Sequence, residues 1–193
     1  MNSIFYFCQN AKMSTCSTSI VECLRAQGIE PTAFASSEMR SSYKASNALE
    51  YSTSNDFRTK IENKPQYWAV DFKKIVTINS YQIKTNNGDN DFKKWMISTS
   101  FDNKTWTLAT GLNTGFPGDT KYPLNKAYSA RYARVDAGCI DGDHTFFYMY
   151  YIKFFGSLGG SKPANAANAA NSCFRRKTID ANLLVMIFLI TKS

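Results

Sequence analysis

The sequence predicts an all-β protein, on three observations. In Tyr67–Phe72 every second side chain is large and apolar, which is the period of a strand with one face in a core. Ser100–Trp106 has the pattern of a strand that enters a turn at Asp102–Lys104, because Asp and Asn bond their own backbone and tolerate left-handed geometry. The 193 residues also include 11 Tyr and 14 Phe, and aromatic side chains are enriched in strands.

Three parts follow one another along the chain. Residues 1–30 are predicted as a polar, Cys-bearing extension outside the core, with a short helix around Ile20–Ala26. Residues 31–158 are predicted as the β-domain, in which strand patterns are separated by Asn, Asp, Gly and Pro. Beyond the two segments above, strands are predicted at Val76–Lys84, Trp95–Thr99, Trp106–Ala109, Ala130–Asp136 and Phe146–Phe155.

Residues 159–193 are predicted as a low-complexity tail. An Asn-Ala repeat over 163–171 has no large apolar side chain to bury and is interpreted as a linker. Arg175–Lys177 is basic, and the apolar run Leu183–Ile190 is far shorter than the roughly 20 residues that span a bilayer. No transmembrane span is therefore predicted, and a helix that docks on the domain or on a partner is favoured over a lipid-anchor signal.

Charge gives little support to nucleic-acid binding. The formal net charge is +8, but the lysines of the middle region are scattered and form no dense run. A solvated surface is favoured over a nucleic-acid patch, so no nucleic-acid partner is expected.

The cysteines predict free thiols. The five cysteines include no Cys-x-x-Cys pair, so a zinc site is not predicted, and the β-domain would hold only Cys139. The apolar stretch Ile4–Phe7 is too short for a signal peptide and has no basic residue before it. Free thiols suit a reducing compartment, and the predicted location is cytoplasmic.

Catalysis is not predicted. His144 is the only histidine, and no Gly-x-Ser-x-Gly elbow or phosphate-cradling Gly-rich loop is present. Paired carboxylates occur only at expected loop tips, where solvent keeps carboxyl pKa values ordinary. The chain is therefore predicted to be non-enzymatic, with no catalytic residue, metal or cofactor.

Six segments together resemble the discoidin family, also called the coagulation factor V/VIII type C domain. They occur in family order: Ala35–Ser37, Asn47–Leu49, Pro65–Phe72, Ser100–Trp106, Ala130–Val135 and Phe154–Gly156. Phe72-Lys73-Lys74 after the aspartate, and the lack of a terminal cysteine pair, are similar to intracellular members found in protists. The resemblance implies an eight-stranded jelly-roll β-sandwich that binds ligands, without catalysis, on loops at one end.

Three loops correspond to that binding end. In residues 38–44, aromatic and apolar side chains can stack or enter an interface while basic side chains reach anionic groups. Residues 86–93 offer amides and carboxylates for sugar hydroxyls, although this is also common turn chemistry. Residues 141–144 place a histidine beside two carboxylates, although a lone histidine in a turn is more often an ordinary surface residue. The candidate ligand-binding residues are Met39, Arg40, Tyr43, Lys44, Asp89, Asp91, Asp143 and His144.

Two further predictions concern the framework. The three tryptophans lie within alternating strands, so we expect Trp68, Trp95 and Trp106 in the core rather than in a stacking platform. Asp71 and Arg134 are expected to form a structural ion pair.

The ligand that ranks first is a glycan or another polar small ligand, because loop-tip Asp, Asn and His supply hydrogen bonds and aromatic rings supply stacking. The alternatives are an intracellular protein-interaction adaptor that uses the basic, apolar tail, and peripheral binding to anionic membranes through Met39, Tyr43 and lysines.

Overall fold

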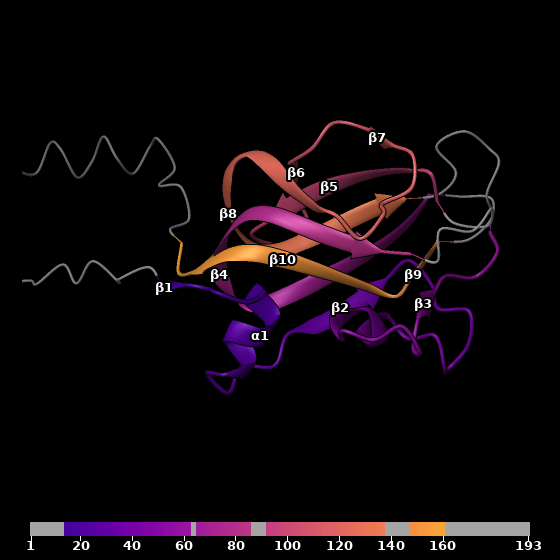
Figure 1. The fold of residues 1–193 in the computed structure, drawn as a ribbon, viewed down its shortest axis with the longest axis horizontal. Coiled ribbons are helices and arrows are strands. Elements are labelled where there is room, and N and C mark those ends of the chain that lie inside the picture. The colour runs from indigo at the N-terminus through magenta and orange to yellow at the C-terminus, as the bar shows by residue number, and fades with distance from the viewer. Residues whose placement is uncertain (1–13, 63–64, 86–91, 138–146, 161–193) are drawn as a thin grey trace, which may run out of the picture. The chain divides into compact units, whose positions relative to one another are not determined.

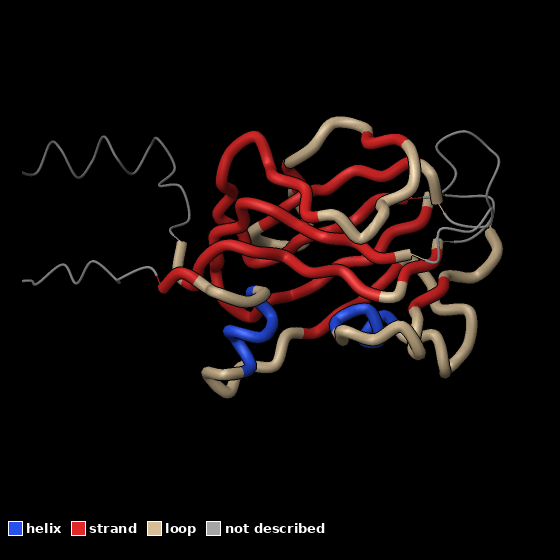
Figure 2. Tube along the Cα trace, in the orientation of Figure 1, coloured by secondary structure: helices blue, strands red, loops and turns tan. Residues whose placement is uncertain are grey.

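Strands dominate the computed structural model, which describes residues 14–62, 65–85, 92–137 and 147–160 (Figures 1 and 2). Residues 1–161 group into one compact unit, and the second, 162–193, lies outside the described residues. The elements of the first unit are β1 (Ser14–Thr15), α1 (Ile20–Arg25), β2 (Thr32–Ala35), the 3-10 helix η1 (Ala45–Leu49), β3 (Phe57–Arg58), β4 (Gln66–Lys84), β5 (Lys94–Ser100), β6 (Trp106–Leu108), β7 (Asn113–Thr114), β8 (Lys121–Ala137), β9 (Tyr148–Met149) and β10 (Tyr151–Leu158).

The strands of the described residues pair antiparallel. Eight of them form one hydrogen-bonded sheet, and β3 and β9 form a separate two-stranded sheet. The predicted all-β fold is confirmed. Tyr67–Phe72 and Val76–Lys84, predicted as separate strands, are parts of the single 19-residue strand β4.

The two longest strands each run through both layers of the sandwich. The first layer contains β2, the beginning of β4, the end of β8, β5 and β6. The second contains β1, β10, the end of β4 and the beginning of β8. The pairing of β4 with β8 shifts register between Asp71 and Val76, where Lys73 has a φ of 65°. The irregular pairing marks the bend, and Figure 1 shows β8 curving round at this end.

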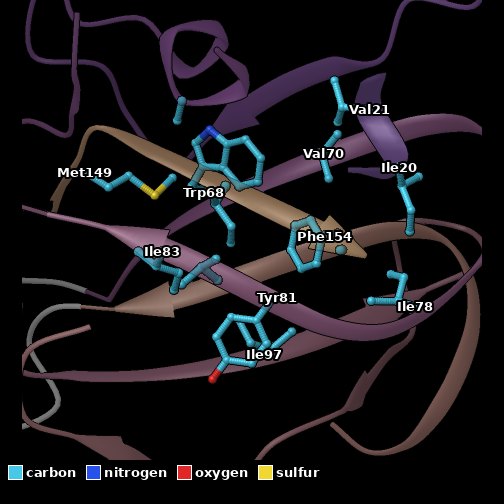
Figure 3. Close-up of a cluster of buried hydrophobic side chains, with 14 of the residues drawn as sticks. Ile20, Val21, Trp68, Val70, Ile78, Tyr81, Ile83, Ile97, Met149 and Phe154 are labelled. Carbon is cyan, nitrogen blue, oxygen red and sulfur yellow. The ribbon is translucent and has the colours of Figure 1, made fainter. Parts of the chain in front are cut away.

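The core lies between the two layers (Figure 3). Trp68 and Trp95 have at most 1% of their surface exposed, which confirms their predicted burial. Each indole N–H has a partner: Trp68 Nε1 donates to the Ala45 carbonyl at 2.8 Å, and Trp95 Nε1 donates to Tyr81 Oη at 3.2 Å. The two bonds satisfy the only polar atoms of these rings, as burial requires.

Trp106 departs from the prediction. It is half-buried on the outer face of the first layer, where the Arg134 guanidinium carbon lies 4.4 Å from its ring centroid. Its pattern of alternation is that of the other tryptophans, but β6 has only three residues and pairs only with β5. A strand this short does not reveal from sequence which of its faces is buried.

The N-terminal segment is also different from the prediction. The short helix is confirmed as α1, and its first turn has a capping box in which Ser19 and Glu22 exchange hydrogen bonds. Ile20 and Leu24 are fully buried, however, and belong to the core cluster. The assignment of residues 14–30 to a non-core extension was therefore wrong, because the apolar face of α1 packs against β10 and β4 (Figure 3).

The predicted ion pair between Asp71 and Arg134 is wrong. Arg134 lies opposite Ala69 in the register, and its Nε is 3.0 Å from an oxygen of Asp136 on the same strand. Asp71 instead accepts two hydrogen bonds of 2.9 Å from Arg131, next to the register shift. Burial raises the pKa of Asp71, but hydrogen bonds from Arg131 and Lys73 outweigh burial and lower it overall.

Candidate ligand-binding site

The predicted site residues divide into two groups. Asp89, Asp91, Asp143 and His144 lie outside the described residues. Met39, Arg40, Tyr43 and Lys44 lie on the segment between β2 and η1. This segment is hydrogen-bonded to β3 through the Met39 amide. Strand β3 pairs with β9 at the end of the sandwich opposite the bend of β8 (Figure 1).

Hydrogen bonds to neighbouring strands hold the segment between β2 and η1 in place. The Ser36 amide donates to the Tyr67 carbonyl at 3.0 Å, where β2 leaves the sheet. The Met39 amide donates to the Arg58 carbonyl at 2.9 Å, so Met39 is held beside β3. Glu38 accepts from the Ala45 amide at 2.7 Å, which closes the loop onto η1. The loop therefore has a defined position before any ligand binds.

Arg58 lies at the centre of the candidate site, and it was not predicted from the sequence. Its guanidinium carbon lies 4.4 Å from the Tyr43 ring centroid and 4.9 Å from that of Tyr148. The neighbouring Asp56 carboxylate is 2.6 Å from the guanidinium. We call Tyr43, Asp56, Arg58 and Tyr148 the Arg58 cluster. It combines a planar cation, a carboxylate and two aromatic rings on three different segments.

The charge state of the cluster is stable. Burial lowers the pKa of Arg58, but the Asp56 hydrogen bond and charge outweigh burial and raise it overall. Burial is also the largest cause that raises the pKa of Tyr148, followed by its hydrogen bond with Tyr150. Arg58 therefore remains a cation and Tyr148 a neutral phenol at neutral pH.

Aromatic packing supports the cluster from below. The rings of Phe57 and Phe147 meet edge to face with centroids 5.6 Å apart, and Phe92 meets Phe147 at 4.8 Å. Thr59 Oγ1 accepts from the Phe147 amide at 2.8 Å, while the Thr59 amide donates to the Phe147 carbonyl at 3.0 Å. This buried base fixes β3 against β9, and with them Arg58 against Tyr148.

The arrangement suits a polar ligand. The Arg58 side chain keeps 35% of its surface exposed, so its guanidinium has N–H groups that can donate beyond Asp56. Arg40 and Lys44 are exposed on the same loop as Tyr43. The signal in the sequence was Asp56-Phe57-Arg58, in which the charged residues are two apart and so share one face of a strand. This tripeptide matches no known motif for catalysis or ligand binding, so it did not mark Arg58 as a candidate.

The described residues contain neither a metal-binding group nor a membrane-spanning helix. No group of three or more His, Cys, Asp or Glu side chains there is placed to hold a metal ion. Within the same ranges, no helix has the length and apolar character needed to cross a membrane.

Comparison with known proteins gives a family and a set of similar folds. The F5/8 type C domain model matches residues 32–143. Chitosan-binding module 1 of a chitosanase/glucanase from Paenibacillus sp. IK-5 is 20% identical, with a TM-score of 0.57 over 72% of this chain and 98% of that one. The family 32 carbohydrate-binding module of NanJ from Clostridium perfringens, in complex with galactose, is 21% identical, with a TM-score of 0.56 over 72% and 98%.

A third similar structure is chitosan-binding module 2 of the Paenibacillus enzyme in complex with chitotriose. It is 15% identical, with a TM-score of 0.56 over 65% of this chain and 95% of that one. Comparison with curated protein sequences gave no match. The fold agrees with these modules, and the family model covers more than half of the sequence. The chain belongs to the F5/8 type C domain family.

Proposed function

We propose that this protein is a non-enzymatic glycan-binding module and that the Arg58 cluster is the centre of its binding site. The observation that carries the proposal is the Arg58 guanidinium, which Asp56 holds between the rings of Tyr43 and Tyr148. The structures in complex with galactose and with chitotriose support the choice of a glycan.

Sugar chemistry matches the groups in the cluster. An arginine and a carboxylate side by side offer donors and acceptors to adjacent hydroxyl groups of a pyranose. Aromatic rings offer their faces to the apolar C–H side of the sugar, as in many ligand sites of mixed polarity. Exposed Arg40 and Lys44 extend the site along the loop. We also keep Met39, Asp89, Asp91, Asp143 and His144 as proposed contributors.

A glycan array probed with the full chain tests the proposal. We expect at least one bound glycan, and we expect Arg58→Ala to weaken that binding by roughly 10- to 100-fold, because a charge-assisted hydrogen bond contributes about 1.5–3 kcal/mol. Arg58→Lys keeps the charge without the planar fork and should also weaken binding. Arg25→Ala is the matched control, because Arg25 is an ion-paired arginine of α1.

Two other partners give different results in parallel assays. If the glycan array is blank and anionic liposomes bind the protein in a salt-sensitive manner, the ligand is a lipid surface and not a glycan. A protein partner that is lost when residues 161–193 are deleted would favour the adaptor. A blank array alone is enough to overturn the glycan proposal.

We propose the cytoplasm as the location, supported by two free thiols. Cys16 and Cys23 are unpaired and pack against the core. Burial is the largest cause that raises the pKa of Cys16, to about 12, so this thiol is protonated at neutral pH and little reactive. Alkylation under denaturing conditions, without a reductant and in a fresh lysate, should label both thiols. A disulfide between Cys16 and Cys23 in that lysate would contradict the proposed location.

A further inference from the structure

A second cluster of aromatic and charged side chains lies on the outer face of the first layer. Trp106, on β6, is the tryptophan that the core leaves half-exposed, since Trp68 and Trp95 are buried. Tyr67 on β4 and Arg134 on β8 are half-buried on the same face. With Asp136, these residues form what we call the Trp106 face. The Arg58 cluster shares no residue with it.

The register explains how residues from separate strands meet there. Arg134 lies opposite Ser98 of β5, and Trp106 lies opposite Ser100 of β5. Directly opposed residues of antiparallel strands share one face of the sheet. On this face, the β5 residues between β6 and β8 are these two small, buried serines, so the Trp106 ring can meet the Arg134 side chain across β5.

The three planar groups form a row across the sheet. The Arg134 guanidinium carbon lies 4.4 Å from the Trp106 ring centroid and 5.4 Å from the Tyr67 centroid. Cation–π contacts at this range stabilise such an arrangement and hold the side chains in place. The row therefore offers a ready-made aromatic surface.

Polar groups on this surface are charge-balanced. Arg134 forms a salt bridge of 3.0 Å with Asp136, and the Ser98 hydroxyl lies 3.4 Å from the same carboxylate. Ser98 itself is buried, so the surface presents aromatic rings, the Tyr67 phenol and a neutralised ion pair, which are complementary to a polyhydroxylated ligand without net charge. It is less suited to an anionic polymer, because Asp136 offsets the charge of Arg134.

We propose that the Trp106 face is a second binding site, for a chain of neutral sugars that lies across β4, β8 and β6. Tyr67 adjoins the loop segment that leads to the Arg58 cluster, since the Tyr67 carbonyl accepts the Ser36 amide at the start of that segment. The ligand class is that of the proposed function, but the residues are different, so either site can be lost without the other.

Tryptophan emission reports directly on this face. All three tryptophans lie within the described residues, and two of them are buried, so acrylamide quenching of the full chain reports mainly on Trp106. The probes are galactomannan, hydroxyethylcellulose and N,N',N''-triacetylchitotriose, with polygalacturonate as the acidic comparison. We expect at least one neutral probe to protect the emission from acrylamide and polygalacturonate to do so less.

Variants show whether the protection from acrylamide comes from ligand bound at Trp106. Trp106→Phe should abolish the protection, and Trp106→Ala should weaken binding of the effective probe in calorimetry by roughly 10-fold, as for loss of one stacked ring. Tyr51→Ala is the matched control, because Tyr51 is 69% exposed and packs with Lys153 of β10 in the second layer. Thermal unfolding of each variant checks that the fold is intact.

The proposals for the two sites are tested independently of each other. Arg58→Ala should leave the acrylamide protection unchanged, whereas Trp106→Ala should leave the Arg58-dependent binding in place. The inference is overturned if no neutral probe protects Trp106, or if protection persists in Trp106→Phe. It is also overturned if Arg58→Ala removes the protection, because the signal would then come from the loop site.

Discussion

Gly156 and Thr77 approach each other so closely that a β-carbon on Gly156 would lie 1.8 Å from the Thr77 carbonyl oxygen. Gly156 has a φ of +155° and lies where the pairing of β10 with β4 shifts register. Only a residue without a side chain allows the two backbones to remain paired through this irregularity. The closing strand of the sandwich therefore depends on one hydrogen atom in place of a methyl group.

We expect Gly156→Ala to destabilise the protein by about 3 kcal/mol or more, because the clash is with backbone that cannot rotate away. Urea unfolding of the full chain measures the change. Gly111→Ala is the matched control, since nothing lies within 4 Å of a β-carbon there, and it should shift the midpoint little. Equal midpoints for the two variants would show that β10 adapts to the side chain.

Asp71→Asn should lower stability at neutral pH by about 1–3 kcal/mol, because a buried carboxylate that accepts from Arg131 and from the Lys73 amide is lost. The pKa of Asp71 is lowered in the fold, so its contribution is present above the unfolded value near 3.8. It disappears as the pH falls through the lower folded pKa.

Chemical unfolding between pH 7 and pH 2 measures this difference, which should be largest at neutral pH and shrink in acid. Glu30→Gln is the control. Its pKa is also lowered, by a hydrogen bond from Arg25, but its side chain is 64% exposed, and surface pairs contribute little. A constant difference between wild type and Asp71→Asn at all pH values would argue against the ion pair as its cause.

Leu24→Ala should destabilise the whole domain by about 2–5 kcal/mol, because Leu24 is fully buried in the core cluster. Ser17→Ala, at an exposed position before α1, should be close to neutral. Thermal unfolding followed by circular dichroism distinguishes the two. If Leu24→Ala melted like Ser17→Ala, α1 would be dispensable for the sandwich.

The pH dependence of glycan binding tests the proposed part of His144. An ordinary histidine titrates near pH 6.5, so wild-type affinity should change through about that pH. His144→Ala should bind with constant affinity from about pH 5 to about pH 9, because the pKa values of Arg58 and Tyr148 are both raised and neither changes charge there.

Calorimetric titration with the bound glycan gives both profiles. A flat wild-type profile would remove His144 from the site and leave the Arg58 cluster. A slope that persists in His144→Ala would point instead to another titrating group at the ligand.

Period alone located parts of the long strands, but it divided β4 into two and missed the first half of β8, and it did not predict the surroundings of side chains near strand ends and breaks. Trp68 and Trp95 lie in long strands whose alternation matches burial, whereas Trp106 lies on a three-residue edge strand. The partner of Asp71 was wrong because a register shift follows it, and register shifts leave no mark in the pattern of apolar residues.

The proposed binding site combines one side chain that was selected from the sequence with others that were not. Tyr43 was selected for its aromatic ring on a loop, and the structure places it on Arg58. Arg58 itself was overlooked because β3 has only two residues and pairs with β9, about ninety residues further along the chain, as the register of Phe57 with Met149 shows. Contacts between segments this distant depend on the whole fold, which local spacing does not describe.

The burial of α1 has a practical consequence for anyone who expresses this domain. The family model begins at residue 32 and stops at residue 143. A fragment cut to those limits would lack the helix that supplies Ile20 and Leu24, and it would also lack β10, the partner of both β1 and β4. The smallest piece that retains every described element runs from Ser14 to Leu158, so family boundaries are a poor guide to where this protein should be cut.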